Sequence, residues 1–166
     1  MNRIDKLFKE KKENILSVYF TAGYPKTDDT IEVIKTLEKK GVDLLEIGVP
    51  FSDPMADGPV IQASGNESLR NGMSLKKLFA QLKNVRAEAS IPLVLMGYLN
   101  PIMQYGFENY CKSAAECGVD GLIIPDLPFS EYMESYKSIA EKHGLHMIML
   151  ITPETSEERI KLIDQN

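Results

Sequence analysis

The segment from Leu45 to Pro59, LEIGVPFSDPMADGP, concentrates the residues of this chain that could carry acid–base chemistry. Glu46, Asp53 and Asp57 fall within fifteen positions that also contain three prolines. Proline restricts the backbone, so the loop favours one defined geometry over many. Two carboxylates held at a fixed separation over a substrate could divide the roles of acid and base.

Glu46 is the acid most suited to proton transfer. It lies between Leu45 and Ile47, so we expect it to be at least partly buried. Burial favours the neutral form of a carboxyl group, which can then deliver and recover a proton near neutral pH. A structural acid paired with a buried Lys or Arg is the alternative, and the pattern leaves both interpretations open.

Asp57 precedes a glycine, and Asp-Gly is a common pair in turns. The stiffened loop and the closeness of Glu46 argue for a functional carboxylate, and the pattern alone leaves both interpretations open. Asp53, in the sequence FSDP, is interpreted as a turn or surface acid.

The elements that must position these acids alternate between short apolar runs and amphipathic helical runs. Strands are expected over residues 15–21, 42–48, 92–98, 119–124 and 145–151. Helices are expected over residues 2–13, 28–40, 74–89, 107–117 and 130–143, and from a capping box at Thr155 onward. In the first helix we expect Ile4, Leu7 and Phe8 to face inward. The fold class is therefore α/β with a parallel sheet, either a doubly wound open sheet or a (β/α)₈ barrel.

Both architectures bind ligands beyond the carboxyl ends of their strands. Tyr98 stands at such an end, and Asp126 follows the fourth expected strand in the sequence IPDLP. Tyr98 could contact a ligand or only pack against neighbours.

Size and composition exclude several other classes of protein. The chain has 166 residues and a formal charge of −5, so we expect a single domain over residues 1–166. No basic stripe with interleaved aromatic residues and no apolar run of about 20 residues occurs, so neither nucleic acid nor a membrane is an expected partner. Cys111 and Cys117 are interpreted as reduced thiols of a cytoplasmic protein, and no metal site is expected.

The quoted residues resemble a known family, the α subunit of tryptophan synthase. The stretch LEIGVPFSDPMADGPVIQ looks like the signature of that family, and YFTAGYP, MGYLNP, YGFENYC, GVDGLIIPDLP and ITPETSEERI support it in register. The resemblance selects the (β/α)₈ TIM barrel over the open sheet.

The resemblance implies a carbon–carbon lyase of tryptophan biosynthesis. That family cleaves indole-3-glycerol phosphate to indole and glyceraldehyde 3-phosphate in a retro-aldol reaction without a cofactor. Glu46 matches the catalytic glutamate, and Asp57 matches the aspartate that accepts a hydrogen bond from the indole N–H. Tyr98 matches a tyrosine of the indole pocket, and Tyr19 and Asp126 fall at further positions near the substrate.

The resemblance also implies a partner. The family's α subunit docks on a β subunit that holds pyridoxal phosphate, in an α₂β₂ complex. The residues that would lie toward that partner are Pro50, Asp53, Pro54, Asn100 and Pro128. A chain that only docks, without catalysis, and another phosphate-binding barrel of the same pathway are the competing interpretations.

A complete (β/α)₈ barrel usually needs roughly 250 residues, and this sequence contains about five βα units. We therefore expect a piece of a longer α subunit that lacks the phosphate-binding turns and the mobile lid. We also expect these residues alone to cleave the substrate far more slowly than a complete barrel, because remote binding energy often raises the rate at the reacting centre.

Overall fold

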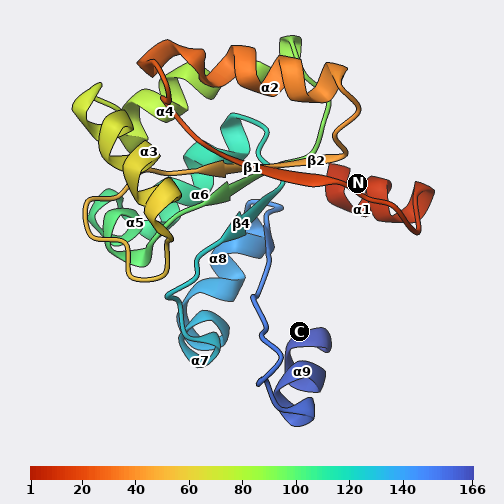
Figure 1. Cartoon of the computed structure of the whole chain (residues 1–166). Helices are drawn as coiled ribbons and strands as arrows, with labels where there is room; N and C mark the ends of the chain where they lie inside the picture. The colour runs from red at the N-terminus through yellow and green to blue at the C-terminus, as the bar shows by residue number, and fades with distance from the viewer.

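The computed structural model describes all residues from Met1 to Asn166 and shows helices packed around a twisted parallel sheet (Figure 1). The strands are β1 (Ser17–Thr21), β2 (Leu44–Gly48), β3 (Leu93–Met96), β4 (Gly121–Ile123) and β5 (His146–Met147). The helices are α1 (Arg3–Glu10), α2 (Thr30–Lys39), α3 (Pro59–Arg70), α4 (Leu75–Leu82), α5 (Leu99–Tyr105), α6 (Phe107–Glu116), α7 (Phe129–Glu131), α8 (Lys137–Lys142) and α9 (Glu157–Asp164). Short 3₁₀ turns cover Thr27–Asp29 and Val85–Ala87, and a π-helical segment covers Tyr132–Tyr136.

The order of the strands in the sheet decides between the two expected architectures. All neighbouring strands are parallel, and they follow one another in the order β1-β2-β3-β4-β5. A doubly wound sheet reverses its strand order at a switch point, whereas a barrel adds each strand beside the previous one. The structure therefore confirms the barrel type of α/β fold.

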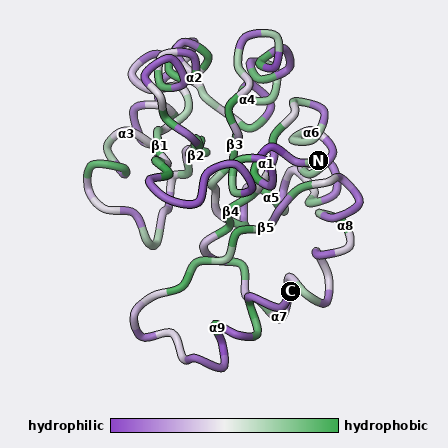
Figure 2. Tube along the Cα trace, turned by 90° about the vertical axis from the view of Figure 1, so that its right-hand side faces the viewer, coloured by the Kyte–Doolittle hydropathy of each residue, from purple (hydrophilic) through white to green (hydrophobic).

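The two faces of the sheet carry different cores, because successive side chains of a strand point to opposite faces. The outer face packs against the helices in a cluster of 28 buried residues, which includes Leu45, Ile47 and Leu95. The inner face carries only a small cluster, made by Ile4, Leu44, Val94 and Ile123. Apolar segments accordingly gather where the strands meet the helices (Figure 2).

A buried acid fixes the amino ends of the strands. Asp120 is 3% exposed and lies just before β4. Its carboxylate accepts hydrogen bonds from Arg86 at 2.8 Å, from Arg3 at 3.1 Å and from the backbone N–H of Leu93 at 3.0 Å. Burial lowers the pKa of the Arg86 guanidinium, and the negative charge of Asp120 opposes that effect. These contacts join α1, β3 and β4 on the side away from the carboxyl ends.

Several expected elements differ from the structure. Helices α3 and α5 are not predicted from the sequence, and residues 74–89, expected as one helix, form α4 only as far as Leu82. The fifth strand is limited to His146–Met147. Phe8 was expected to face inward but is 52% exposed, and the residue that caps α9 is Ser156, not Thr155.

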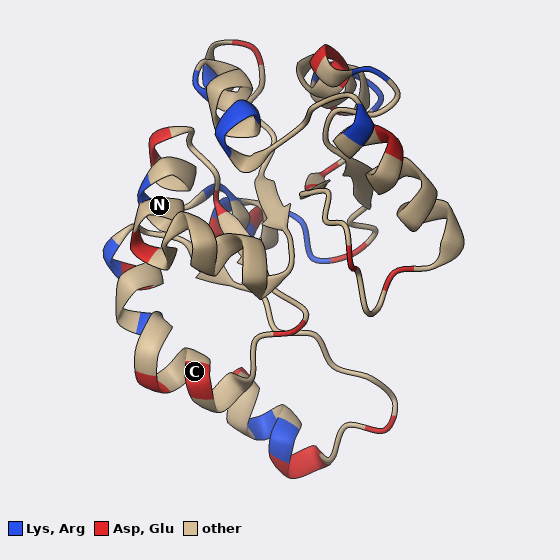
Figure 3. Cartoon of the chain, turned by 90° about the vertical axis from the view of Figure 1, so that its left-hand side faces the viewer, with Lys and Arg blue, Asp and Glu red and all other residues tan.

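The last helix lies apart from the sheet, at the end of an extended segment (Figure 1). None of its residues is buried, and Ile160 and Leu162 are exposed. Acidic and basic residues are interspersed along the helices in the view of Figure 3. No helix combines the length and the apolar character that crossing a membrane requires.

Candidate active site at the carboxyl ends of the strands

Glu46 lies on the inner face of the sheet, in the middle of β2. It pairs in register with Tyr19 of β1 and Val94 of β3. Its side chain is partly buried, as expected, but no Lys or Arg forms an ion pair with it. The Ser17 hydroxyl donates a 2.6 Å hydrogen bond to Oε1 of Glu46. The structure therefore excludes the paired structural acid that the sequence left open.

Asp57 lies in the loop that connects β2 to α3, and its side chain is partly buried. The helix begins at Pro59, which suits the first helical position because its missing N–H would be unpaired there in any case. The Gln62 side chain donates a 2.8 Å hydrogen bond back to the Asp57 carbonyl oxygen. The start of α3 thus fixes the backbone at Asp57.

Tyr98 connects the end of β3 to this loop. Its side chain is 6% exposed, and its hydroxyl oxygen accepts a 3.0 Å hydrogen bond from the backbone N–H of Ala56. Its ring lies 5.5 Å from the ring of Phe51, centroid to centroid. Burial raises the pKa of Tyr98, the Ala56 N–H lowers it, and the nearby Asp57 carboxylate raises it further.

Tyr19 pairs in register with Glu46, and its phenol also lies within electrostatic reach of Asp57. Burial raises the pKa of Tyr19, a hydrogen bond from Thr21 lowers it, and the negative charges of Asp57 and Glu46 raise it further. Its ring covers Gly48 so closely that a Cβ atom there would lie 2.0 Å from the phenol oxygen. A glycine at position 48 is therefore a condition for the observed position of Tyr19.

Asp126 makes a structural contact. Its Oδ1 accepts a 2.8 Å hydrogen bond from the backbone N–H of Leu99, the first residue of α5. This contact ties the loop after β4 to the rim residue that follows Tyr98. The expectation that Asp126 also contacts a substrate remains a prediction.

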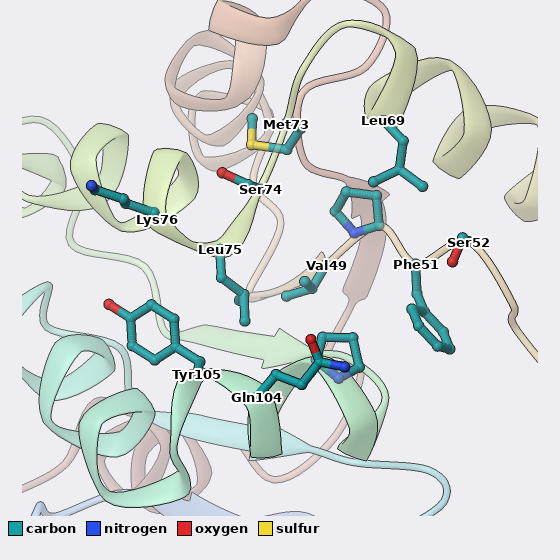
Figure 4. A pocket seen from close by; sticks show the side chains of 12 residues that line it. Val49, Phe51, Ser52, Leu69, Met73, Ser74, Leu75, Lys76, Gln104 and Tyr105 are labelled. Carbon is teal, nitrogen blue, oxygen red and sulfur yellow. The ribbon is translucent and has the colours of Figure 1, made fainter.

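A separate pocket of about 430 Å³ is lined by residues of the loop that follows β2, of α4 and of α5 (Figure 4). Pro50, Phe51 and Leu75 contribute apolar side chains to it, and Lys76 and Gln104 lie at its border. Neither Glu46 nor Asp57 lines this pocket. It is therefore distinct from the site of the two acids, although the same loop borders both.

With this geometry in place, comparison with known proteins decides the family. The family model described as tryptophan synthase alpha chain matches residues 6–166. The chain belongs to the tryptophan synthase alpha chain family.

Curated relatives in this family are similar over nearly the whole chain. The tryptophan synthase alpha chain of Parabacteroides distasonis is 64% identical over 164 residues, which are 99% of this chain and 64% of that protein. The tryptophan synthase alpha chain of Flavobacterium psychrophilum is 60% identical over 164 residues, which are 99% of this chain and 64% of that protein. The chain thus spans about 64% of the length of these relatives.

Solved structures of the family share the fold. The alpha chain from Legionella pneumophila superimposes with a TM-score of 0.91 at 41% identity, covering 99% of this chain and 63% of that one. Tryptophan synthase from Mycobacterium tuberculosis superimposes with a TM-score of 0.90 at 30% identity, covering 97% of this chain and 65% of that one. These similarities confirm that the chain has the TIM-barrel type of fold.

The residues expected to face a partner lie at the same rim, and their role in this family member remains a prediction. Asp53, Asn100 and Pro128 are exposed, and Pro50 and Pro54 are partly buried. Asp53 accepts a hydrogen bond from Ser52, and Asn100 accepts one from Gln104 at 2.9 Å.

Ser17 contacts Glu46 but is not predicted as a site residue from the sequence. Ser17, Tyr19 and Thr21 alternate along β1, so all three point to the inner face on which Glu46 lies. A serine in an otherwise apolar run was the available signal. Its significance depends on the register of β1 against β2, which the sequence does not specify.

Proposed function

We propose that this chain carries the acid–base part of the site that cleaves indole-3-glycerol phosphate to indole and glyceraldehyde 3-phosphate. The observation that carries the proposal is the arrangement of Tyr19, which pairs in register with Glu46 and covers Gly48 at the end of β2. Burial raises the pKa of its phenol, and the negative charges of Asp57 and Glu46 raise it further. One aromatic side chain thus lies within electrostatic reach of both acids. We infer that an indole ring bound beside Tyr19 interacts with both acids.

The roles of the acids follow from the chemistry of a retro-aldol cleavage. Glu46 protonates C3 of the indole ring, and after protonation it takes the proton from the glycerol hydroxyl as the carbon–carbon bond breaks. Asp57 accepts a hydrogen bond from the indole N–H, which stabilises the positive charge that develops on the protonated ring. The tyrosines at positions 19 and 98 form walls of the indole pocket, and Asp126 lies at its edge.

The reaction needs no cofactor on this chain, because proton transfer and charge stabilisation are sufficient for it. Pyridoxal phosphate belongs to the proposed partner, a β subunit in an α₂β₂ heterotetramer. We place the protein in the cytoplasm, in the pathway of tryptophan biosynthesis.

The face toward the partner comprises Pro50, Asp53, Pro54, Asn100 and Pro128, and the pocket of Figure 4 lies beside it. This face supports a second candidate function, in which the chain docks on the β subunit without cleaving substrate. A pull-down with the β subunit, set beside an assay of indole release, separates the two functions.

The proposal is tested by indole release from indole-3-glycerol phosphate. Because the chain spans about 64% of the length of its relatives, the assay uses the chain alone and the chain joined to the remaining residues of the Parabacteroides distasonis relative. Asp57→Asn in the joined protein should lower kcat about 100-fold, since a charge-complementing contact of the transition state is lost. Asp53→Asn is the matched control in the same loop and should leave kcat unchanged without the β subunit. Equal rates for both variants would contradict the proposal.

A further inference from the structure

Glu46 has a single hydrogen-bond partner in the protein. Ser17 donates to Oε1 at 2.6 Å, and no group of the chain donates to Oε2. Ser17 comes from the neighbouring strand, two residues before Tyr19, which is the register partner of Glu46. The carboxylate is therefore held from one side by a residue of another strand, and its second oxygen is left free.

A hydroxyl group suits this position because it can act as donor or acceptor. It donates to the ionised carboxylate, and it can rotate to accept from the protonated acid. A Lys or Arg in the same place would favour only the ionised form. Ser17 can thus keep contact with Glu46 in both protonation states that a proton-transferring group passes through.

We propose that Ser17 is a positioning residue that anchors Oε1 of Glu46 and leaves Oε2 as the oxygen that carries the proton. This inference rests on the proposed function of Glu46. It also predicts that Ser17 holds the Glu46 carboxylate in place, and this can be tested without measuring turnover.

The experiment compares the wild-type chain with Ser17→Ala and Ser17→Thr. Ser17 is exposed, so neither change creates a cavity in the core. A carbon-detected NMR spectrum of the side-chain carboxyl groups should show a shifted Glu46 Cδ resonance in Ser17→Ala. Ser17→Thr keeps the hydroxyl and should restore the wild-type position.

A second serine–glutamate pair supplies the control. Ser90 donates to Oε1 of Glu38 at 2.8 Å, at the opposite ends of the strands from Asp57. Ser90→Ala should move the Glu38 resonance and leave that of Glu46 in place. An unchanged Glu46 resonance in Ser17→Ala, or no rescue by Ser17→Thr, would overturn the inference.

Turnover provides an independent readout. Ser17→Ala should lower kcat for indole release about 10-fold with little change in KM, since a small misplacement of a reacting group costs rate more than binding. An unchanged or faster rate in Ser17→Ala would overturn the positioning role even if the resonance moves. If the wild-type chain releases no indole, the proposed activity of the chain alone fails, and the NMR comparison still decides whether Ser17 anchors Glu46.

Discussion

The hydroxyl oxygen of Tyr98 accepts a 3.0 Å hydrogen bond from the backbone N–H of Ala56, so the end of β3 is tied to the residue before Asp57. A strand end thereby fixes a loop that follows a different strand. The prolines of that loop limit its conformations, and this contact helps to select one in which Asp57 lies within electrostatic reach of Tyr19 and Tyr98.

Tyr98→Phe should loosen the loop without unfolding the protein. The change removes the hydrogen-bond acceptor for Ala56 and keeps the ring that packs on Phe51. We expect a loss of about 1 kcal/mol in the free energy of unfolding. Amide exchange at Ala56 should become faster, as measured by hydrogen–deuterium exchange in NMR. Unchanged exchange at Ala56 would show that the loop holds its position without Tyr98.

Gly48→Ala should displace Tyr19 and destabilise the protein. The added Cβ would lie 2.0 Å from the phenol oxygen and 2.4 Å from the ring carbon that bears it. Overpacking of this kind costs about 1–3 kcal/mol. Gly65→Ala is the matched control, because no atom lies within 4 Å of its Cβ position and Gly65 is inside α3. It should stabilise the protein by about 0.5–1 kcal/mol, so urea unfolding of the two variants should show shifts of opposite sign.

Among substitutions outside the candidate site, Asp120→Asn should cause one of the largest losses in the free energy of unfolding. It removes the negative charge that Arg86 and Arg3 share and leaves the largely buried Arg86 without its ion-pair partner. We expect a loss of about 3 kcal/mol in the free energy of unfolding. The exposed pair of Glu108 and Lys142 serves as a control, and Glu108→Gln should change stability little. Equal effects of the two substitutions in urea unfolding would contradict the anchoring role of Asp120.

Asp43 should make stability depend on pH in the acid range. The backbone N–H of Leu16 and the ammonium group of Lys11 hold the pKa of Asp43 below its usual range in the folded chain. A depressed folded-state pKa contributes stability that is present above the unfolded value of about 3.9 and is lost as pH falls through the folded value. Asp43→Asn should therefore lower the urea midpoint at pH 7. The difference from the wild-type chain should shrink below about pH 4. A difference that is constant across this range would contradict the assignment.

Cys111 should resist thiol reagents in the folded chain. Burial raises the pKa of its thiol to about 12, so almost none of it is thiolate at pH 8. Cys117 is also buried, and burial raises its pKa as well. Reaction with Ellman's reagent at pH 8 should be slow for both cysteines until urea unfolds the protein. Rapid reaction of the folded chain would show that this part of α6 opens.

The sequence predicted the alternation of strands and helices because each strand is a short apolar run bounded by glycine or proline. It did not predict α3, whose sequence PVIQASGNESLR contains weak helix formers and buries only Gly65 and Ser68. It also did not predict α5, which carries Pro101 in its first turn and follows the end of β3 directly. In the structure α3 packs against β1 and α5 packs against α6, so both helices depend on tertiary packing more than on their own propensity.

The sequence predicts those candidate site residues that lie close together in one segment of the chain. Glu46 in β2 and Asp57 in the loop that follows became candidates through their residue types and spacing, and the family resemblance assigned their roles, which remain predictions. Ser17 and Asp120 were missed because their partners are distant in sequence. Glu46 is 29 residues from Ser17, and Arg3 is 117 residues from Asp120. The contact of Ser17 with Glu46 depends on the register of β1 against β2, and that of Arg3 with Asp120 depends on where α1 packs. Neither can be predicted from a local sequence pattern.

The most direct test of the account is kcat for indole release by Glu46→Gln in the chain joined to the remaining residues of its Parabacteroides distasonis relative. Glutamine keeps the size of the side chain and removes the acid that we propose delivers the proton. The account predicts a fall of at least about 1,000-fold with an unchanged urea midpoint, in line with the contribution of a general acid. A variant that keeps kcat within a factor of about two would show that another group protonates the indole ring, and the assignment of Glu46 would be wrong.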